Sequence, residues 1–138
     1  MKRVLALDIG EKRIGLAVSD PLQITAQGLE TYHRCGDLDA DIDYLIDKAK
    51  SFAPVLVLFG LPRNMNGSYG PQAQMVRDFA DAFQSKWQGE IDFYDERLTT
   101  VTAEKVLIEA DVSRAKRKNV IDKLAAVVIL QGYLDSRG

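Results

Sequence analysis

Three carboxylates stand at positions where a folded core rarely places an acid. Asp8 interrupts an apolar segment, Glu96 directly follows another, and Asp122 stands just before a third. A buried carboxylate without a partner is costly, so such groups shift their pKa, pair with a cation or bind metal. Three of them on separate core elements predict one shared cation site. A divalent metal held by oxygen ligands is its expected occupant.

Asp8 lies in a strand predicted over residues 3–9, and Asp8-Ile9-Gly10 leads into a hairpin with residues 14–19. Buried charge is rare, which favours a metal or phosphate role over an ordinary turn former. Asp-x-Gly before a hairpin also occurs in actin-like and sugar-kinase folds, where it faces the phosphates of ATP. This motif alone therefore leaves both classes of site open.

The second candidate is an acidic pair, Asp95-Glu96, at a junction between a strand and a helix. Strand alternation sends the two side chains to opposite faces, so only one of them can join Asp8. Ligand sites in open α/β sheets favour the carboxyl ends of strands. A helix-capping role would explain one acid, but not two followed by Arg97.

Asp122 is the third candidate, on a predicted helix. It shares helical spacing with Ala126, Ile129 and Tyr133, which places it on an apolar stripe. Asn119 lies one turn earlier on the same side and could assist there. An acid near a helix N-terminus also relieves the helix dipole. The sequence supports the two readings of Asp122 equally.

Basic and amide side chains near these acids are the candidates for holding a phosphate backbone. A run of charge is commonly only a solvated surface. The position of the main run, directly before Asp122, favours a nucleic-acid role. The candidates are Lys12, Arg13, Arg63, Asn64, Arg97, Arg114, Lys116, Arg117, Lys118 and Lys123.

The elements that must position these residues follow from hydrophobic periodicity. We predict strands over residues 3–9, 14–19, 24–33, 55–59 and 91–95, and helices over 39–52, 72–87, 100–110 and 119–135. Residues 111–118 are predicted to be a polar, basic connector, and the acidic segment 37–43 a first helical turn. Early strands should pair antiparallel and later ones parallel through right-handed crossovers. The prediction is an α/β, RNase H-like fold with a mixed five-stranded sheet and helices on both faces.

Bulk properties narrow the class of protein. The chain has 138 residues, which predicts a single domain over 1–138, and its 46% hydrophobic content can build a core. No apolar stretch is long enough to predict a membrane span. The net charge of −2 requires any nucleic-acid binding to use local basic patches. One cysteine and one histidine cannot alone form a four-ligand zinc site, and a cytoplasmic location is expected.

Four motifs together resemble the YqgF family, bacterial proteins described as Holliday junction resolvases and as pre-16S rRNA nucleases. The resemblance runs over essentially the full chain, in order. The motifs are Asp8-Ile9-Gly10, Gly60-Leu61-Pro62-x-Asn64-Met65-x-Gly67, Asp95-Glu96-Arg97-Leu98-Thr99-Thr100 and Asp122-Lys123-Leu124-Ala125-Ala126. The family implies an RNase H-like fold similar to the RuvC resolvase. Its acidic site falls on Asp8, Glu96 and Asp122.

The resemblance implies a hydrolase, a nuclease that depends on two Mg²⁺ or Mn²⁺ ions, with Asp8 bridging them and Glu96 and Asp122 each holding one. We expect it to process the 5′ end of precursor 16S rRNA in ribosome biogenesis, with the ribosomal subunit as a further partner. The alternatives are a Holliday junction resolvase-like DNA nuclease and a non-catalytic RNA- or ribosome-binding factor. An actin-like or sugar-kinase protein would need a second lobe, for which 138 residues leave no room.

Overall fold

The computed structural model describes residues 2–62, 69–95 and 114–137, and gives only the backbone of residues 114–124 and 137. The elements in chain order are β1 (Val4–Ile9), β2 (Arg13–Ser19), β3 (Ala26–His33), α1 (Leu38–Phe52), β4 (Leu56–Leu61), α2 (Pro71–Gln84), β5 (Glu90–Asp95) and α4 (Arg114–Arg137). In the described ranges the strands form one sheet in the order β3-β2-β1-β4-β5.

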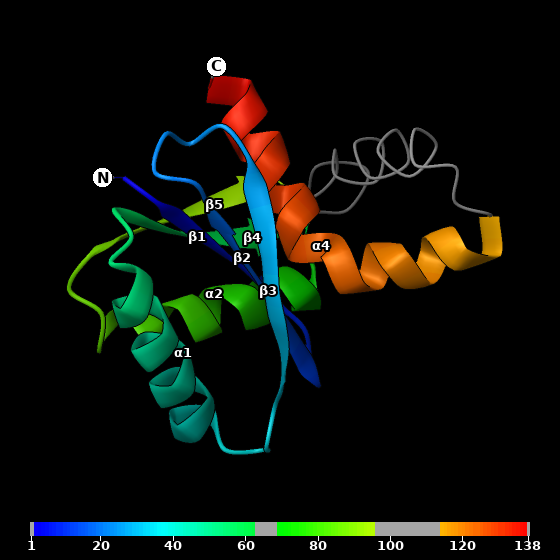
Figure 1. Cartoon of the computed structure of the whole chain (residues 1–138). Coiled ribbons are helices and arrows are strands. Elements are labelled where there is room, and N and C mark those ends of the chain that lie inside the picture. The colour runs from blue at the N-terminus through cyan, green and yellow to red at the C-terminus, as the bar shows by residue number, and fades with distance from the viewer. Residues whose placement is uncertain (1, 63–68, 96–113, 138) are drawn as a thin grey trace.

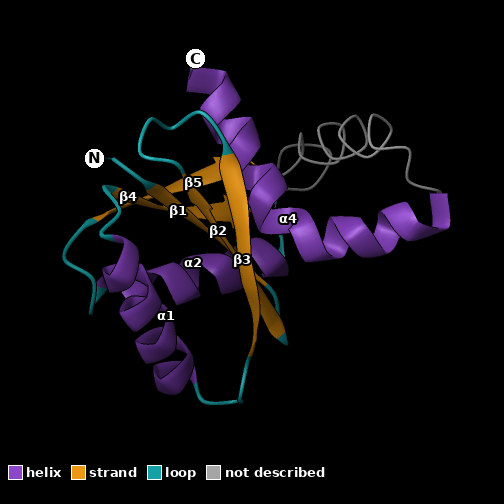
Figure 2. Cartoon of the chain, in the orientation of Figure 1, coloured by secondary structure: helices purple, strands orange, loops and turns teal. Residues whose placement is uncertain are grey.

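The sheet is mixed, as predicted. β2 pairs antiparallel with β1 and with β3, whereas β4 pairs parallel with β1 and with β5. Helices α1 and α2 cover one face of the sheet and α4 crosses the other (Figures 1 and 2). The predicted architecture of a five-stranded mixed sheet with helices on both faces is therefore confirmed.

The central strand β1 is apolar along most of its length because both of its faces are covered. Leu5 and Leu7 pack in the core beneath α1 and α2, whereas Val4 and Ala6 pack beneath α4. Small residues such as Ala6 and Ala17 on the second face let α4 approach the sheet closely. Strand alternation then assigns every β1 residue to one face or the other.

The helical content differs from the prediction near the C-terminus. Residues 114–118, predicted as part of a connector, belong to α4, which begins at Arg114. The prediction was wrong because Arg, Lys and Ala are good helix formers, so a basic run need not break a helix. The predicted helix over 100–110 and the rest of that connector, residues 111–113, lie outside the described residues.

Other boundaries shift by a few residues. Strand β4 continues to Leu61, and α2 ends at Gln84 rather than at 87. Helix α1 begins after Asp37, whose carboxylate accepts hydrogen bonds from the backbone N–H groups of Asp39 and Ala40. Over the stretches that the structure describes, none of the helices is both long and apolar enough to cross a bilayer.

Candidate functional site

Asp8 lies on the face of the sheet that α4 covers. Alternation along β1 places it with Val4 and Ala6, and its side chain is half-buried. Its antiparallel partner in β2 is Gly15. A Cβ atom added at Gly15 would lie 3.5 Å from the Cβ of Ala126 and 3.7 Å from the Cβ of Asp8. The absence of a side chain at Gly15 therefore lets α4 approach Asp8 closely, near the end of β1.

Asp122, the third predicted ligand, is also a residue of α4. Ala126 and Ile129 are buried against the sheet, so the predicted apolar stripe is confirmed for these two residues. Position 122 lies one helical turn before Ala126 on that stripe. That residue 122 lies close to Asp8 stays a prediction. The side chain of Asp122 is outside the described part.

The carboxyl ends of β1, β4 and β5 gather at one edge of the sheet because the three strands are parallel. In β5, Phe93 faces the α1 and α2 side, with its ring centroid 6.0 Å from that of Phe59, whereas Tyr94 packs on the α4 side. Alternation therefore assigns Asp95 to the face opposite Asp8. Asp95 is not the acid that can join Asp8, and Glu96, the next residue, lies outside the described residues.

Tyr94 fixes how α4 crosses β5. A Cβ atom at Gly132 would lie 2.9 Å from the Tyr94 hydroxyl, so only glycine permits this approach. The Tyr94 ring meets that of Tyr133 edge to face, with centroids 6.3 Å apart. Burial first, and then the nearby carboxylates of Asp95 and Asp135, raises the pKa of Tyr94. This phenol stays neutral at physiological pH and acts as a packing and positioning group.

Of the three predicted metal ligands, the structure describes the side chain of Asp8 alone, and this side chain suits a hard divalent cation. Asp8 supplies carboxylate oxygens, the ligand type that Mg²⁺ and Mn²⁺ prefer. Among the side chains that the structure describes, no group of three His, Cys, Asp or Glu residues is arranged to hold a metal. The side chains of Glu96 and Asp122 are not among them. The three-acid ligand set therefore stays a prediction.

The predicted nucleic-acid contacts divide into three groups. Lys12 and Arg13 are exposed at the β1–β2 turn, beside the edge that carries Asp8, and the turn is closed by a 2.8 Å bond from the Gly10 N–H to the Arg13 carbonyl. The backbone of α4 carries Arg114, Lys116, Arg117, Lys118 and Lys123. The remaining candidates, Arg63, Asn64 and Arg97, lie outside the described residues.

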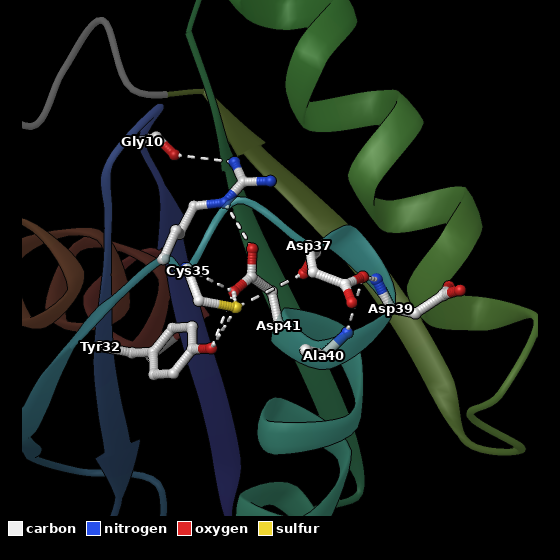
Figure 3. Close-up of polar contacts among 8 residues, drawn as sticks. Gly10, Tyr32, Cys35, Asp37, Asp39, Ala40 and Asp41 are labelled. Carbon is white, nitrogen blue, oxygen red and sulfur yellow. Dashed lines mark hydrogen bonds and ion pairs between the residues drawn. The ribbon is translucent and has the colours of Figure 1, made fainter.

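A buried acid on α1 was missed by sequence reasoning. Asp41 is fully buried and accepts hydrogen bonds from the Tyr32 hydroxyl at 2.7 Å, the Arg34 Nε at 2.9 Å and the Cys35 backbone N–H at 3.3 Å. Figure 3 shows these groups converging. Its spacing of four and eight residues from Leu45 and Ala49, both buried, was the available signal.

The Asp41 network reaches the candidate active edge. Arg34, bonded to Asp41 through Nε, also donates from Nη1 to the Gly10 carbonyl at 3.1 Å. Burial opposes ionisation of Asp41, but the hydrogen bonds from Tyr32, Arg34 and Cys35 outweigh it, so its pKa lies below the usual range. The charged carboxylate thus fixes Arg34 against the turn that follows Asp8.

Substitutions at Gly15 should test the contact between Asp8 and α4. An added methyl meets only ordinary van der Waals distances, so Gly15→Ala should leave stability and activity near the wild-type values. Gly15→Leu should lower the free energy of unfolding by about 1–3 kcal/mol through overpacking and should also reduce cleavage, because it pushes Ala126 from Asp8. Urea denaturation with a cleavage assay measures both. Equal behaviour of the two variants would contradict this packing.

The fold has close structural relatives in solved proteins. Thermus thermophilus RuvC in complex with a Holliday junction substrate superposes with a TM-score of 0.67 at 13% identity, covering 99% of this chain and 96% of that one. The Fowlpox virus Holliday junction resolvase superposes with a TM-score of 0.54 at 14% identity, covering 99% of each chain. The predicted RNase H-like class, in its RuvC-like form, is therefore confirmed.

Sequence comparison identifies the family. The RuvX family, described as a Holliday junction resolvase, matches residues 2–136. A Clostridium novyi protein is 52% identical over 134 residues, covering 97% of this chain and 98% of that protein. A Heliobacterium modesticaldum protein is 50% identical over 135 residues, covering 98% and 90%. Both bear the name "Putative pre-16S rRNA nuclease". The chain belongs to the RuvX family, a nuclease family, and the resemblance drawn from its four motifs is confirmed.

Proposed function

We propose that this protein hydrolyses phosphodiester bonds in structured nucleic acid, with the 5′ end of precursor 16S rRNA as its substrate. One observation carries the proposal. A half-buried carboxylate, Asp8, is the last but one residue of the central strand of a RuvC-like sheet, on the face where α4 packs. Relatives about half identical to this chain bear the name of a pre-16S rRNA nuclease, which supports RNA as the substrate.

The proposed site joins Asp8 with Glu96 and Asp122 around two Mg²⁺ or Mn²⁺ ions. Such ions, when bound, supply Lewis acidity and lower the pKa of bound water. The contribution of the chain is to hold the carboxylates where their mutual repulsion favours cation binding. Strand β1 holds Asp8 in place, so this carboxylate requires little reorganisation when substrate arrives.

A DNA four-way junction is the second candidate substrate. The family is described as a Holliday junction resolvase, and Thermus thermophilus RuvC has been solved with a Holliday junction. A symmetric junction requires two active sites and hence a dimer, whereas trimming an RNA end requires one. For the RNA reaction we propose a cytoplasmic setting with the ribosomal subunit as partner.

The test is a direct comparison of substrates. The purified full chain is incubated with labelled precursor 16S rRNA and, separately, with a labelled four-way DNA junction, each with Mg²⁺ or Mn²⁺ and each with EDTA. Metal-dependent cleavage of the RNA at its 5′ side, exceeding cleavage of the junction, is the expected result. Cleavage of the junction without cleavage of the RNA would show that the substrate is branched DNA. Binding of both substrates without cleavage of either would remove the enzymatic proposal.

The basic residues of α4 should supply phosphate contacts. Replacing Arg114, Lys116, Arg117 and Lys118 with alanine should weaken nucleic-acid binding similarly across sequences, since phosphate contacts do not read bases. When the variant binds, fewer counterions are released from the nucleic acid, because four phosphate contacts are missing. The slope of log affinity against log salt concentration should therefore flatten by roughly 3–4 units on a duplex. A binding titration at several salt concentrations, with Ca²⁺ present to prevent cleavage, measures this slope.

A control variant removes three positive charges from the opposite side of the sheet. Lys48 and Lys50 belong to α1, and Lys86 follows α2, so all three lie away from the α4 face. Replacing them with alanine should leave the salt slope within one unit of the wild-type value. Equal flattening in both variants would show a general charge effect, and an unchanged slope in the α4 variant would assign that run to solvated surface.

A further inference from the structure

A pocket lies between α1 and α2 on the face of the sheet opposite α4. Its volume is about 490 Å³, within the range of small-molecule sites. Its walls are mainly apolar, with three polar side chains among them. The lining residues are Arg34, Leu38, Pro71, Gln74, Met75, Asp78 and Phe79. An apolar slot with a few polar groups suits a flat, partly polar ring better than an ion or a sugar.

One lining residue of the pocket is bonded to the turn that follows Asp8. Arg34 lines the pocket and donates to the carbonyl of Gly10, which follows directly on β1 and is two residues beyond Asp8. The first turns of α1 and α2 contribute Leu38 and Pro71. A nucleotide chain lying along the turn after Asp8 could therefore reach both the pocket and the proposed cleavage site.

The cation in the pocket is held rigidly. The Arg34 side chain is 17% exposed and its guanidinium packs 5.2 Å from the centroid of the Phe79 ring. Its bonds to Asp41 and Gly10 engage two of the five N–H donors of an arginine. A preorganised planar donor group of this kind suits recognition of paired acceptor atoms on a base edge.

The anion in the pocket complements it. The Gln74 Nε2 donates to Asp78 Oδ1 at 2.9 Å, which orients this carboxylate on the exposed side of α2. An ionised carboxylate accepts hydrogen bonds and donates none. Among the bases, guanine offers acceptors at O6 and N7 together with N–H donors on its pairing edge. That combination matches one arginine and one carboxylate in the same pocket.

An exposed cation–π pair joins α2 to the residue before its N-cap. The Arg77 guanidinium stands 4.5 Å from the ring centroid of Tyr69, a residue that is 49% exposed. Aromatic rings and arginine planes at a surface are the groups on which unpaired bases stack. Both residues of the pair are close in sequence to residues that line the pocket. Tyr69 lies two residues before Pro71, and Arg77 directly precedes Asp78.

We propose that this pocket receives one unpaired guanine of the nucleic-acid substrate, with Arg34 donating to O6 and N7 and Asp78 accepting from the N–H groups of the pairing edge. The inference rests on the proposed nuclease function, which it deepens by assigning a base preference near the cleaved bond. Recognition of a base that is splayed out of its stack is the usual mode of sequence reading in single-stranded RNA.

The test uses twelve-residue oligouridylates with the full-length protein in Ca²⁺ buffer. One oligonucleotide is all-uridine, one has a single central guanine, and one has inosine there, which lacks the 2-amino donor. The guanine oligonucleotide should bind about fivefold to a hundredfold more tightly than the all-uridine one, and inosine should fall between them. Equal affinity for the three would overturn the proposal.

A pair of substitutions on α2 localises the effect. Asp78→Asn replaces an acceptor oxygen with a donor, so the guanine preference should fall to within twofold while all-uridine affinity is unchanged. Asp81→Asn, one turn further along α2, is the matched control and should keep the preference. A preference that survives Asp78→Asn would overturn the proposal. If the protein cleaves precursor rRNA but shows no guanine preference, only the proposed guanine recognition is refuted. If it prefers guanine but cleaves nothing, only the nuclease function is refuted.

Discussion

Replacing Asp8 with asparagine is expected to lower the rate of nucleic-acid cleavage by about a hundredfold or more. A bound divalent ion contributes several kcal/mol of charge stabilisation, and each 1.4 kcal/mol is worth a factor of ten in rate. Asparagine keeps the shape of the side chain but removes the charge that would hold the ion. Single-turnover cleavage of labelled precursor rRNA at saturating enzyme measures the rate.

Stability should respond in the opposite direction. Without metal, Asp8→Asn should leave the free energy of unfolding unchanged or slightly increased, since it removes one of several carboxylates proposed to repel each other. Wild-type protein should be stabilised by added Mn²⁺, and the variant much less, because a ligand that binds only the folded state raises stability by mass action. Thermal unfolding with and without Mn²⁺ provides this readout.

Asp95→Asn is the matched control. Asp95 ends a neighbouring parallel strand at the same edge, but alternation along β5 assigns it to the opposite face from Asp8. Its substitution should reduce cleavage less than fivefold. Comparable losses in the two variants would mean that general charge at this edge matters. An unfolded Asp8→Asn variant, or one that cleaves at the wild-type rate, would make Asp8 a structural residue.

The sheet could be predicted because its signals are local. Val57, Leu58 and Phe59 form an uninterrupted apolar run, which is typical of a strand covered on both faces. The hairpin around Gly10 follows from two short aliphatic segments and a polar turn. Asp8 stood out as a candidate for the same reason, since a single acid in such a segment breaks a strong pattern.

Two features were not predicted, one for a local reason and one because it depends on contacts between distant elements. The segment 114–118 reads as a connector from its charge, yet it continues the long helix α4. Asp41 reads as one of several acids suited to a helix N-terminus, because Asp37, Asp39 and Asp43 surround it. Its helical spacing from Leu45 and Ala49 suggests burial, but its partners come from Tyr32 in β3 and from Arg34 just after that strand.

The burial of Asp41 predicts a large stability effect. Asp41→Asn should lower the free energy of unfolding at neutral pH by about 2–4 kcal/mol, since it leaves Arg34 without its buried partner and sets an amide donor against the Arg34 N–H. The matched control is Asp43→Asn. Asp43 pairs with Lys86 at 2.9 Å on the surface, where both side chains are largely exposed. Such a pair is worth at most about 1 kcal/mol, so the control should stay within that range.

The pH dependence of this difference identifies the ionised carboxylate as its source. The pKa of Asp41 is lowered from 3.8 in the folded protein, so its ionised form stabilises the fold fully at pH values above the unfolded-state pKa. That stability is lost as the pH falls below about 3.8 and through the lower folded-state pKa. Urea denaturation of wild type and variant from pH 7 to pH 2 should therefore show the two curves converging in acid. If the difference in the free energy of unfolding stays constant down to pH 2, the loss of stability comes from packing. The claim that the ionised Asp41 carboxylate holds Arg34 beside Gly10 would then be wrong.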